Sequence, residues 1–209
     1  MSEGMKTKIK WAINAVFVVI NLPLLALYFL LLTLVIKASP NGSPNASRQD
    51  ELFAGFSQFY ALWPGKVGVY LRRNFYRFTL REMGPDVTIG FGTLFSHRGT
   101  EIGANVYIGP QCNIGLCRIG SECLIGSGVH ILSGTKQHHF DGSETPLREQ
   151  GGTFTQVNIG ENCWLGNCAL VMGDVAERSV IGAGALVVKS ETPGAVLLGH
   201  KASVRVPSA

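Results

Sequence analysis

Residues 102–126 read IGANVYIGPQCNIGLCRIGSECLIG. In this stretch an isoleucine followed by a glycine recurs, and most of the steps are six residues long. Helical repeats have periods of roughly 20 residues or more, whereas a period near six matches one short strand plus one corner of a β-helix. The stretch therefore predicts a solenoid of stacked β coils.

The same pattern continues on both sides of that stretch. We predict that the aliphatic residue points into the coil and stacks on its equivalent in the next turn, and that the glycine lets the chain turn the corner. The fifth place of each hexad holds a side chain small enough to pack inside a corner. Further aliphatic positions are Ile89, Ile131, Ile159, Leu165, Val171, Val175, Ile181 and Val187, and the fifth-place residues are Val106, Cys112, Cys123, Val129, Cys163, Ala169 and Ala185.

Three regions follow from this pattern. Residues 84–190 carry the hexads, 1–83 precede them as a membrane-anchoring helical region, and 191–209 form a C-terminal tail. The hexads stop at 133–156, which read SGTKQHHFDGSETPLREQGGTFTQ. A loop of this length inside a compact repeat is uncommon and usually functional.

The N-terminal region contains two apolar segments. Residues 11–36 lack charge and as a helix would extend about 39 Å, enough to span a bilayer with tilt. The apolar core of a signal peptide has only about 7–15 residues, so we predict an uncleaved anchor. A linker at 37–51 leads to a second apolar and aromatic segment at 52–71.

Two alternatives stay open for residues 52–71. The segment either makes a second pass through the membrane or lies in the interface as an amphipathic segment. Lysines precede the first apolar segment and four arginines follow the second, and both groups prefer the cytoplasm. The charges therefore favour a helical hairpin or re-entrant pair that returns the repeat domain to the cytoplasmic side. The arginines are Arg72, Arg73, Arg77 and Arg81.

Composition excludes some classes of function. The formal net charge of +4 comes without a basic stripe interleaved with aromatic residues, so no nucleic-acid partner is predicted. The five cysteines include no C-x-x-C pair, and three of them fill the small corner place, which indicates buried thiols in a reducing compartment. The five histidines do not show the spacing of a metal site, so no metal is predicted.

Four motifs carry a resemblance to a known family: HHFD at 138–141, REQGG at 148–152, CWLGN at 163–167 and VIGAGA at 180–185. Together with the hexads they resemble the hexapeptide-repeat acyltransferases, and within them the membrane-associated O-acetyltransferases of saccharide and surface-polysaccharide pathways. The resemblance implies a left-handed parallel β-helix, which assembles as a homotrimer. It also implies active sites between adjacent subunits, where the loop of one closes a cleft against the coils of the next.

Acyl transfer from a thioester to a hydroxyl needs a base, a donor for the developing oxyanion and positioned substrates. Histidine suits the base because its unperturbed pKa is about 6.5. The family's loop pattern, with the base first, implies His138, and adjacent His139 is the alternative. Asp141 could fix the tautomer, as could Glu149 or a backbone carbonyl. No nucleophile arrangement is present, so direct transfer is favoured over an acyl-enzyme.

The acyl donor that the resemblance implies is acetyl-coenzyme A (acetyl-CoA). Its pantetheine arm would lie along a coil edge, and three basic residues could meet the nucleotide phosphates. The tail departs from the family's Gly-x-Pro-Ala turn at 199–202. Carried over by position, the edge residues are Trp164, Gly166, Asn167, Ala183 and Gly184, and the basic residues are Lys189, Lys201 and Arg205. The other histidines, His97, His130 and His200, are expected to be structural or peripheral, with the acceptor cleft as an alternative place for His97.

The expected function is acetyl-CoA-dependent O-acetylation of a sugar. The apolar segments favour a membrane lipid as a partner and a lipid-linked or surface-polysaccharide precursor as the acceptor. Because coenzyme A stays in the cytosol, the repeat domain is expected on the cytoplasmic face of a bacterial inner membrane. Two alternatives stay open: N-acetylation of an amino sugar nucleotide, which the same base would serve, and a non-enzymatic membrane scaffold.

Overall fold

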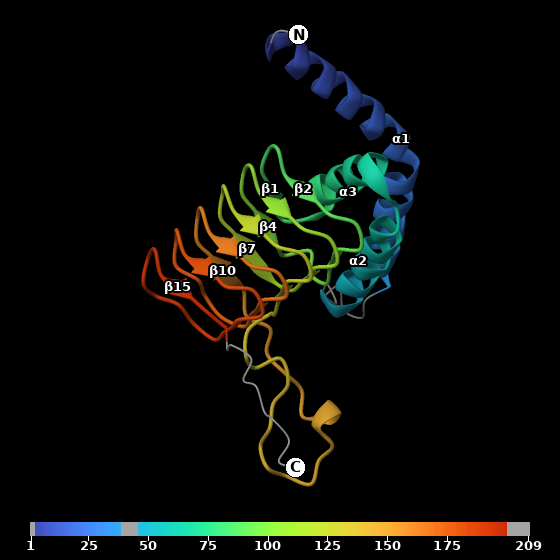
Figure 1. The fold of residues 1–209 in the computed structure, drawn as a ribbon. Helices are drawn as coiled ribbons and strands as arrows, with labels where there is room; N and C mark the ends of the chain where they lie inside the picture. The colour runs from blue at the N-terminus through green and yellow to red at the C-terminus, as the bar shows by residue number, and fades with distance from the viewer. Residues whose placement is uncertain (1–2, 39–45, 200–209) are drawn as a thin grey trace, which may run out of the picture.

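The computed structural model describes residues 3–38 and 46–199. Its repeat domain is a parallel β-helix in which each coil gives a short strand to each of three sheets, so that the coils stack as triangular turns (Figure 1). Sheet A has the order β1-β4-β7-β10, with strands Glu82–Met83, Glu101–Ile102, Cys117–Ile119 and Val157–Ile159. Sheet B contains β2, β5, β8, β11, β13 and β15, which are Thr88–Ile89, Tyr107–Ile108, Leu124–Ile125, Trp164–Leu165, Val180–Ile181 and Val196–Leu197. Sheet C contains β3, β6, β9, β12 and β14, which are Leu94–Phe95, Asn113–Ile114, His130–Ile131, Leu170–Val171 and Leu186–Val187.

The inward aliphatic residues stack as the hexads predict. In sheet B, Ile89 is in register with Ile108, Ile108 with Ile125, and Ile125 with Leu165. All four side chains are fully buried. The seven small fifth-place residues are also at most 2% exposed. The prediction of a parallel β-helix is therefore confirmed, and its core is the line of stacked side chains along the solenoid axis.

The corners turn at a different place from the one predicted. In the corners that lead into sheets B and C, the left-handed backbone conformation lies three residues before the inward residue, and it is held by seven non-glycine residues as well as by glycines. The glycine after the aliphatic residue has another role. At Gly166 an added Cβ would lie 2.6 Å from the backbone nitrogen of Ala183 in the next coil. This glycine is therefore required by the close approach of coils. The seven residues are Asp86, Asn105, Gln111, Glu122, Asn162, Cys168 and Arg178.

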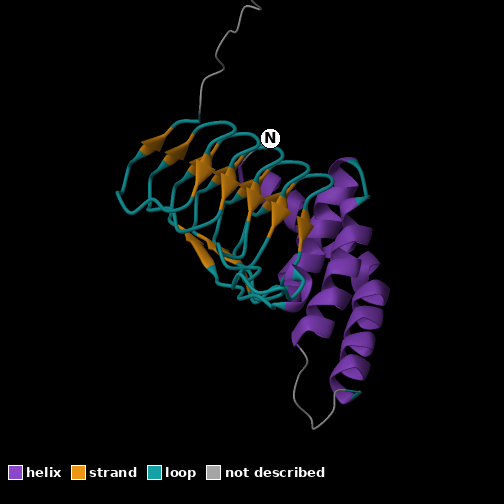
Figure 2. Ribbon diagram, turned by 90° about the horizontal axis from the view of Figure 1, so that it is seen from below, coloured by secondary structure: helices purple, strands orange, loops and turns teal. Residues whose placement is uncertain are grey.

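Three helices, α1 (Glu3–Lys37), α2 (Ala46–Ala61) and α3 (Gly65–Thr79), gather at the N-terminal end of the solenoid (Figure 2). α2 contacts β3, and α3 contacts β1 and β2. The ring of buried Tyr76 in α3 lies 4.5 Å from that of Phe95 in the first coil. The helices therefore cover the open end of the hydrophobic core, as a capping element does in a repeat protein.

α1 is the one helix in the described part of the chain that is long and apolar enough to cross a membrane. Its candidate span, Trp11–Lys37, has a mean hydropathy of 2.6, and only 17% of the window tested is buried. The N-terminal half projects beyond the rest of the protein, and the other half packs against α2 and α3 (Figure 1). Exposed apolar side chains therefore cover most of this helix.

The second apolar segment, 52–71, is interrupted between α2 and α3 near Pro64. The two helices have 16 and 15 residues, which gives lengths of about 24 and 23 Å, less than the ~30 Å of a bilayer core. Both are packed on the solenoid. The predicted second crossing is therefore not supported, whereas a position in the interface stays open.

The element boundaries differ from those expected at two places. α2 begins at Ala46, inside the predicted linker 37–51, of which 39–45 lie outside the described residues. β15 lies inside the predicted tail, of which 200–209 are likewise outside. The loop at 133–156 contains no described strand, and its one short 3-10 helix is Leu147–Glu149.

Candidate active site

The 133–156 loop joins β9 to β10, so it leaves the solenoid at the corner between sheets C and A and projects away from the coils (Figure 1). Its two arms are held together by backbone hydrogen bonds. The N–H of His139 donates to Gly151 at 3.0 Å, and that of Thr153 donates to Lys136 at 2.8 Å. The loop is therefore an ordered, two-armed excursion with the adjacent histidines on its outgoing arm.

The close approach of the two arms of the loop requires a glycine at position 152. An added Cβ at Gly152 would lie 1.8 Å from the Gln137 carbonyl oxygen, one residue before His138. We expect Gly152→Ala to separate the arms and to raise the rate of proteolytic cleavage within 133–156 several-fold, with the melting temperature of the coils unchanged. Gly55→Ala, which meets nothing within 4 Å, is the matched control. Equal cleavage rates in both variants would contradict the expectation.

Both candidate bases, His138 and His139, are exposed in the single chain. His139 Nε2 lies 3.0 Å from Thr153 Oγ1 on the returning arm. Among the described residues, no hydrogen bond involves the His138 ring. The Asp141 carboxylate accepts the backbone N–H of Ser143 at 2.9 Å, which lowers the Asp141 pKa. Asp141 therefore orients its own turn, and the predicted contact with His138 is not formed within one chain.

Five predicted donor-binding residues meet at the corner between sheets B and C. Trp164 lies on β11, 55% exposed, and Gly166 and Asn167 follow it. Ala183 and Gly184 occupy the same corner one coil on, and the N–H of Gly184 donates to the Asn167 carbonyl at 2.9 Å. These five residues therefore share one coil edge, and their role in binding the donor stays a prediction. Gly166 is already explained by coil packing, and Asn167 Oδ1 accepts the N–H of Ser127.

Of the three predicted basic residues, Lys189 is described, and it does not join this edge. Lys189 follows β14, at the corner between sheets C and A from which the loop leaves. Its ammonium group pairs with Glu191 at 2.5 Å, which raises the Lys189 pKa. Lys201 and Arg205 lie outside the described residues. Loop and coil edge thus occupy different corners of the triangle. Within the described part of the chain no hydrogen bond, ion pair or ring contact joins them.

A cavity of about 460 Å³ lies where α2 meets the coils. His97 lies in its wall, with Nδ1 2.8 Å from Ser96 Oγ and its ring 4.9 Å from that of Phe154. Burial lowers the His97 pKa, against a smaller opposing effect of Asp50, so the neutral imidazole is favoured. Phe154 belongs to the returning arm of the loop, which therefore reaches this cavity. The lining residues are Ser47, Asp50, Glu51, Ala54, Ser96, His97, Leu116 and Phe154.

Sequence reasoning missed the carboxylates of this cavity, Asp50 and Glu51, because it read them as linker. A signal was available. Ser47-x-x-Asp50 before an apolar run is a helix-start pattern, and Ser47 Oγ donates to Glu51 at 3.2 Å within α2. The helix then brings Asp50 to the first coil, where its Oδ1 accepts the N–H of Arg98 at 3.0 Å.

The lowered His97 pKa predicts a pH dependence of stability. Between the folded-state pKa and the ordinary value of about 6.5, the unfolded chain binds more protons. The contribution is therefore fully present above about pH 6.5 and is lost as the pH falls below it. We expect the wild type to exceed His97→Gln in melting temperature by a margin that shrinks on acidification. A constant or growing margin would contradict this.

Among residues 3–38 and 46–199, no group of three or more His, Cys, Asp and Glu side chains is placed to hold a metal ion. The side chains of the loop and of the His97 cavity include imidazoles, carboxylates and aromatic rings.

No protein-family model matches the chain. A curated protein from Schizosaccharomyces pombe, named "Putative acetyltransferase", is 30% identical over 124 residues, which cover 58% of this chain and 56% of that protein. The chain therefore spans about half the length of this relative.

Solved structures share the fold. A maltose O-acetyltransferase from Clostridium difficile 630 superposes with a TM-score of 0.62 at 16% identity, over 74% of this chain and 84% of that one. A hexapeptide-repeat acetyltransferase from Vibrio cholerae O1 biovar eltor, complexed with acetyl-CoA, gives 0.61 at 17% identity, over 79% and 91%. A galactoside acetyltransferase in complex with coenzyme A gives 0.60 at 21% identity, over 80% and 86%.

These likenesses extend over 74–80% of this chain and agree with the stacking of triangular turns described above. The fold prediction, a left-handed parallel β-helix preceded by a helical region, is confirmed, and the chain has the fold of the hexapeptide-repeat acetyltransferases.

Proposed function

We propose that this chain is an acetyl-CoA-dependent O-acetyltransferase that acts on a saccharide. The observation that carries the proposal is the ordered histidine loop projecting from a β-helix of the acetyltransferase type. Support comes also from the names of the similar proteins, which include two sugar acetyltransferases and two complexes with acetyl-CoA or coenzyme A.

In the proposed reaction the His138 imidazole takes the proton of a sugar hydroxyl. The hydroxyl oxygen attacks the thioester carbonyl carbon, and the C–S bond breaks as the tetrahedral intermediate collapses. The imidazolium returns the proton to the thiolate. The products are an acetyl ester and free coenzyme A. His139 remains the alternative base, since its ring is already positioned by Thr153.

The site would lie between two copies of the chain in a homotrimer. The loop leaves at the corner between sheets C and A, whereas the coil edge with Trp164 and Gly184 lies between sheets B and C. A loop that projects away from its own coils is suited to meet the coil edge of a neighbour, where the thioester would be presented. Lys189 of the loop-bearing copy would then face the same cleft.

The His97 cavity would hold the acceptor. An aromatic ring beside carboxylates is suited to a sugar, because the ring packs against its C–H face and the carboxylates accept hydroxyl hydrogens. Phe154, Asp50 and Glu51 provide these groups. Phe154 and the proposed base His138 belong to the same loop, so this loop would contact the acceptor and also carry the base.

α1 would anchor the chain in a bacterial inner membrane, which favours a lipid-linked or surface-polysaccharide precursor as the acceptor. The coils would face the cytoplasm, because coenzyme A is charged and cytosolic. Protease digestion of sealed cells tests this orientation. Cleavage within 84–197 from outside the cell would contradict it.

The proposed activity is tested with the detergent-purified full chain, acetyl-CoA and a panel of saccharides. We expect thiol release that depends on a sugar, together with a product heavier by one acetyl group and labile to mild base, as an ester is. A base-stable product formed only from amino sugars would indicate N-acetylation. Absence of thiol release with every sugar would favour a scaffold.

A further inference from the structure

A second cavity, of about 380 Å³, lies between α1, the end of α3 and the first coil. Its volume falls in the ~300–1,000 Å³ range of small-ligand sites. Apolar side chains form much of its wall, and two arginines, Arg81 and Arg98, also line it. The backbone N–H of Arg81 donates to the Arg98 carbonyl at 2.8 Å, which places the two arginines side by side. The apolar walls come from Tyr28, Phe29, Leu32, Phe78 and Leu80.

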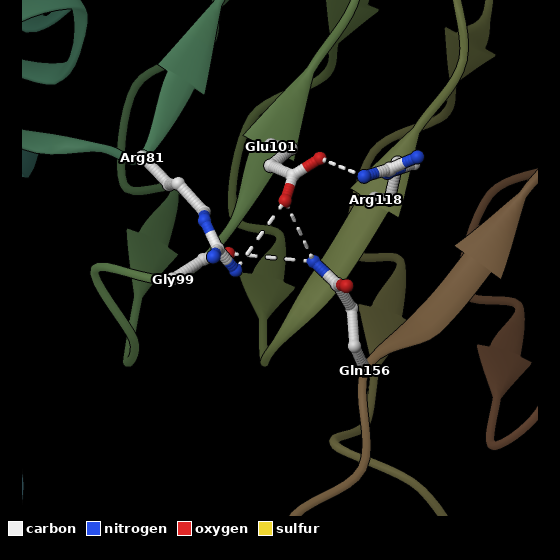
Figure 3. Close-up of polar contacts among 5 residues, drawn as sticks. All are labelled: Arg81, Gly99, Glu101, Arg118 and Gln156. Atoms are coloured by element: carbon white, nitrogen blue, oxygen red, sulfur yellow. Dashed lines mark hydrogen bonds and ion pairs between the residues drawn. The ribbon is translucent and has the colours of Figure 1, made fainter.

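Among the described residues, neither guanidinium makes a hydrogen bond with a carboxylate. The Arg98 side chain donates to the neutral amide of Gln49 at 3.0 Å, and among the described residues no ion pair involves it. Arg81 is 3.7 Å from Glu101, but Arg118 holds that carboxylate at 2.6 Å (Figure 3). Asp50 lies nearby and accepts the Arg98 N–H. Three arginines thus face two carboxylates here, which leaves positive charge and free donors at the cavity.

Tyr28 adds a third donor. Its side chain is fully buried and lines the cavity, and its hydroxyl makes no hydrogen bond of ordinary geometry with the described residues. The Arg98 guanidinium lies close enough to this hydroxyl for an electrostatic and a weak hydrogen-bonding interaction, so the two groups face the same space. An acceptor oxygen in the cavity would give this hydroxyl a hydrogen-bond partner of ordinary geometry. Two guanidiniums and one hydroxyl match the oxygens of a phosphate.

The position of the cavity favours a lipid over a free phosphate. The uncharged run 11–36 has a helical length of about 39 Å, which exceeds a bilayer core of ~30 Å by about six residues. A bilayer spanned by this run would have the end of α1, just after Leu32, at headgroup depth. Phe29 and Phe78 are 43% and 47% exposed beside the cavity, where an apolar chain could lie on them.

We infer that this cavity binds the phosphate of a membrane lipid. Arg81, Arg98 and the Tyr28 hydroxyl donate to the phosphate oxygens, and the lipid chain follows Phe29 and Phe78 along α1. The identification of that lipid with the sugar-bearing acceptor rests on the proposed function, whereas the binding itself does not.

Native mass spectrometry of the full chain in nonionic detergent tests the site, with phosphatidic acid as probe and phosphatidylcholine as the lipid whose phosphate is covered by choline. We expect the wild type to retain phosphatidic acid at least about tenfold better than phosphatidylcholine. Arg81→Gln/Arg98→Gln should abolish the preference. Arg178→Gln removes an exposed arginine that pairs with Glu177 and does not line the cavity, and it should keep the preference.

Tyr28→Phe provides a second test in case the double variant misfolds. It removes one oxygen atom and leaves the packing of the ring unchanged. It should weaken retention of phosphatidic acid several-fold. Equal retention of the two lipids by the wild type would overturn the inference, and so would an unchanged preference in both the double variant and Tyr28→Phe. Displacement of phosphatidic acid by inorganic phosphate at equal concentration would show that the lipid chain contributes nothing, and would also overturn it.

The assay uses no acetyl-CoA, so its failure is separable from that of the proposed function. If the wild type showed no lipid preference but acetylated soluble sugars, the lipid site would be contradicted and the proposed enzyme activity would stand. If the wild type kept the lipid preference but transferred no acetyl group, the proposed activity would be contradicted and the lipid site would stand.

Discussion

His138→Ala is expected to lower kcat for acetyl transfer by about 100-fold or more, the usual contribution of a general base. The KM for acetyl-CoA should change little, because the residues proposed to bind the donor are on the coil edge of another subunit. Since His138 is exposed and no described hydrogen bond depends on its ring, folding should be unaffected. Steady-state thiol release and a melting curve measure the two effects.

His139→Ala and His97→Gln are the matched comparisons. Loss of His139 removes a contact with Thr153 within the loop, so we expect a smaller decrease in kcat. Loss of His97 should raise the KM for the sugar more than it lowers kcat, because His97 lines the proposed acceptor cavity. If His138→Ala kept the wild-type kcat while either comparison variant lost it, the base would have been assigned to the wrong residue.

The second large effect is a loss of stability when Arg72 of α3 is replaced. The Arg72 side chain is fully buried, and among the described residues it has no carboxylate partner. Its Nη1 donates to the Trp63 carbonyl at 2.6 Å and its Nε to the Ile89 carbonyl at 3.0 Å. It thereby ties the α2–α3 turn to the first coil. Burial lowers the Arg72 pKa, but the hydrogen bonds keep the group useful as a donor.

Arg72→Met should reduce the free energy of unfolding by about 3 kcal/mol. Each buried carbonyl left without a donor costs about 1–3 kcal/mol, and relief of the buried charge offsets part of the total. For a chain of this size the melting temperature should fall by roughly 6–12 °C. Arg77→Met, an exposed arginine in the same helix, should change it by less than about 2 °C. Equal shifts in the two variants would show that the buried donor is not needed.

The solenoid could be predicted because its determinants are local. Each coil repeats an inward aliphatic residue and a small corner residue at fixed places, so Ile108 and Cys112 report the same structure independently. The coil edge from Trp164 to Gly184 followed for the same reason, since the register between coils is set by the repeat. The left-handed corners were missed because side chains such as Asn105 and Glu122 adopt that conformation without being glycine.

The His97 cavity could not be predicted, because it depends on contacts between segments far apart in the chain. Asp50 meets Arg98 across 48 residues, and Phe154 meets His97 across the whole insertion. The location of residues 52–71 could not be predicted either, because their apolar side chains are suited both to a bilayer and to packing on the end of a solenoid. The distinction between His138 and His139 depends on the proposed neighbouring subunit, which a single sequence does not place.

The central claim is that this chain places an acetyl group on a saccharide. Mass spectrometry of surface glycans and their lipid-linked precursors, from cells with the wild type, with His138→Ala and without the protein, tests it most directly. The account predicts one additional acetyl ester on a defined sugar in the wild-type cells alone. Identical acetylation in all three would contradict it.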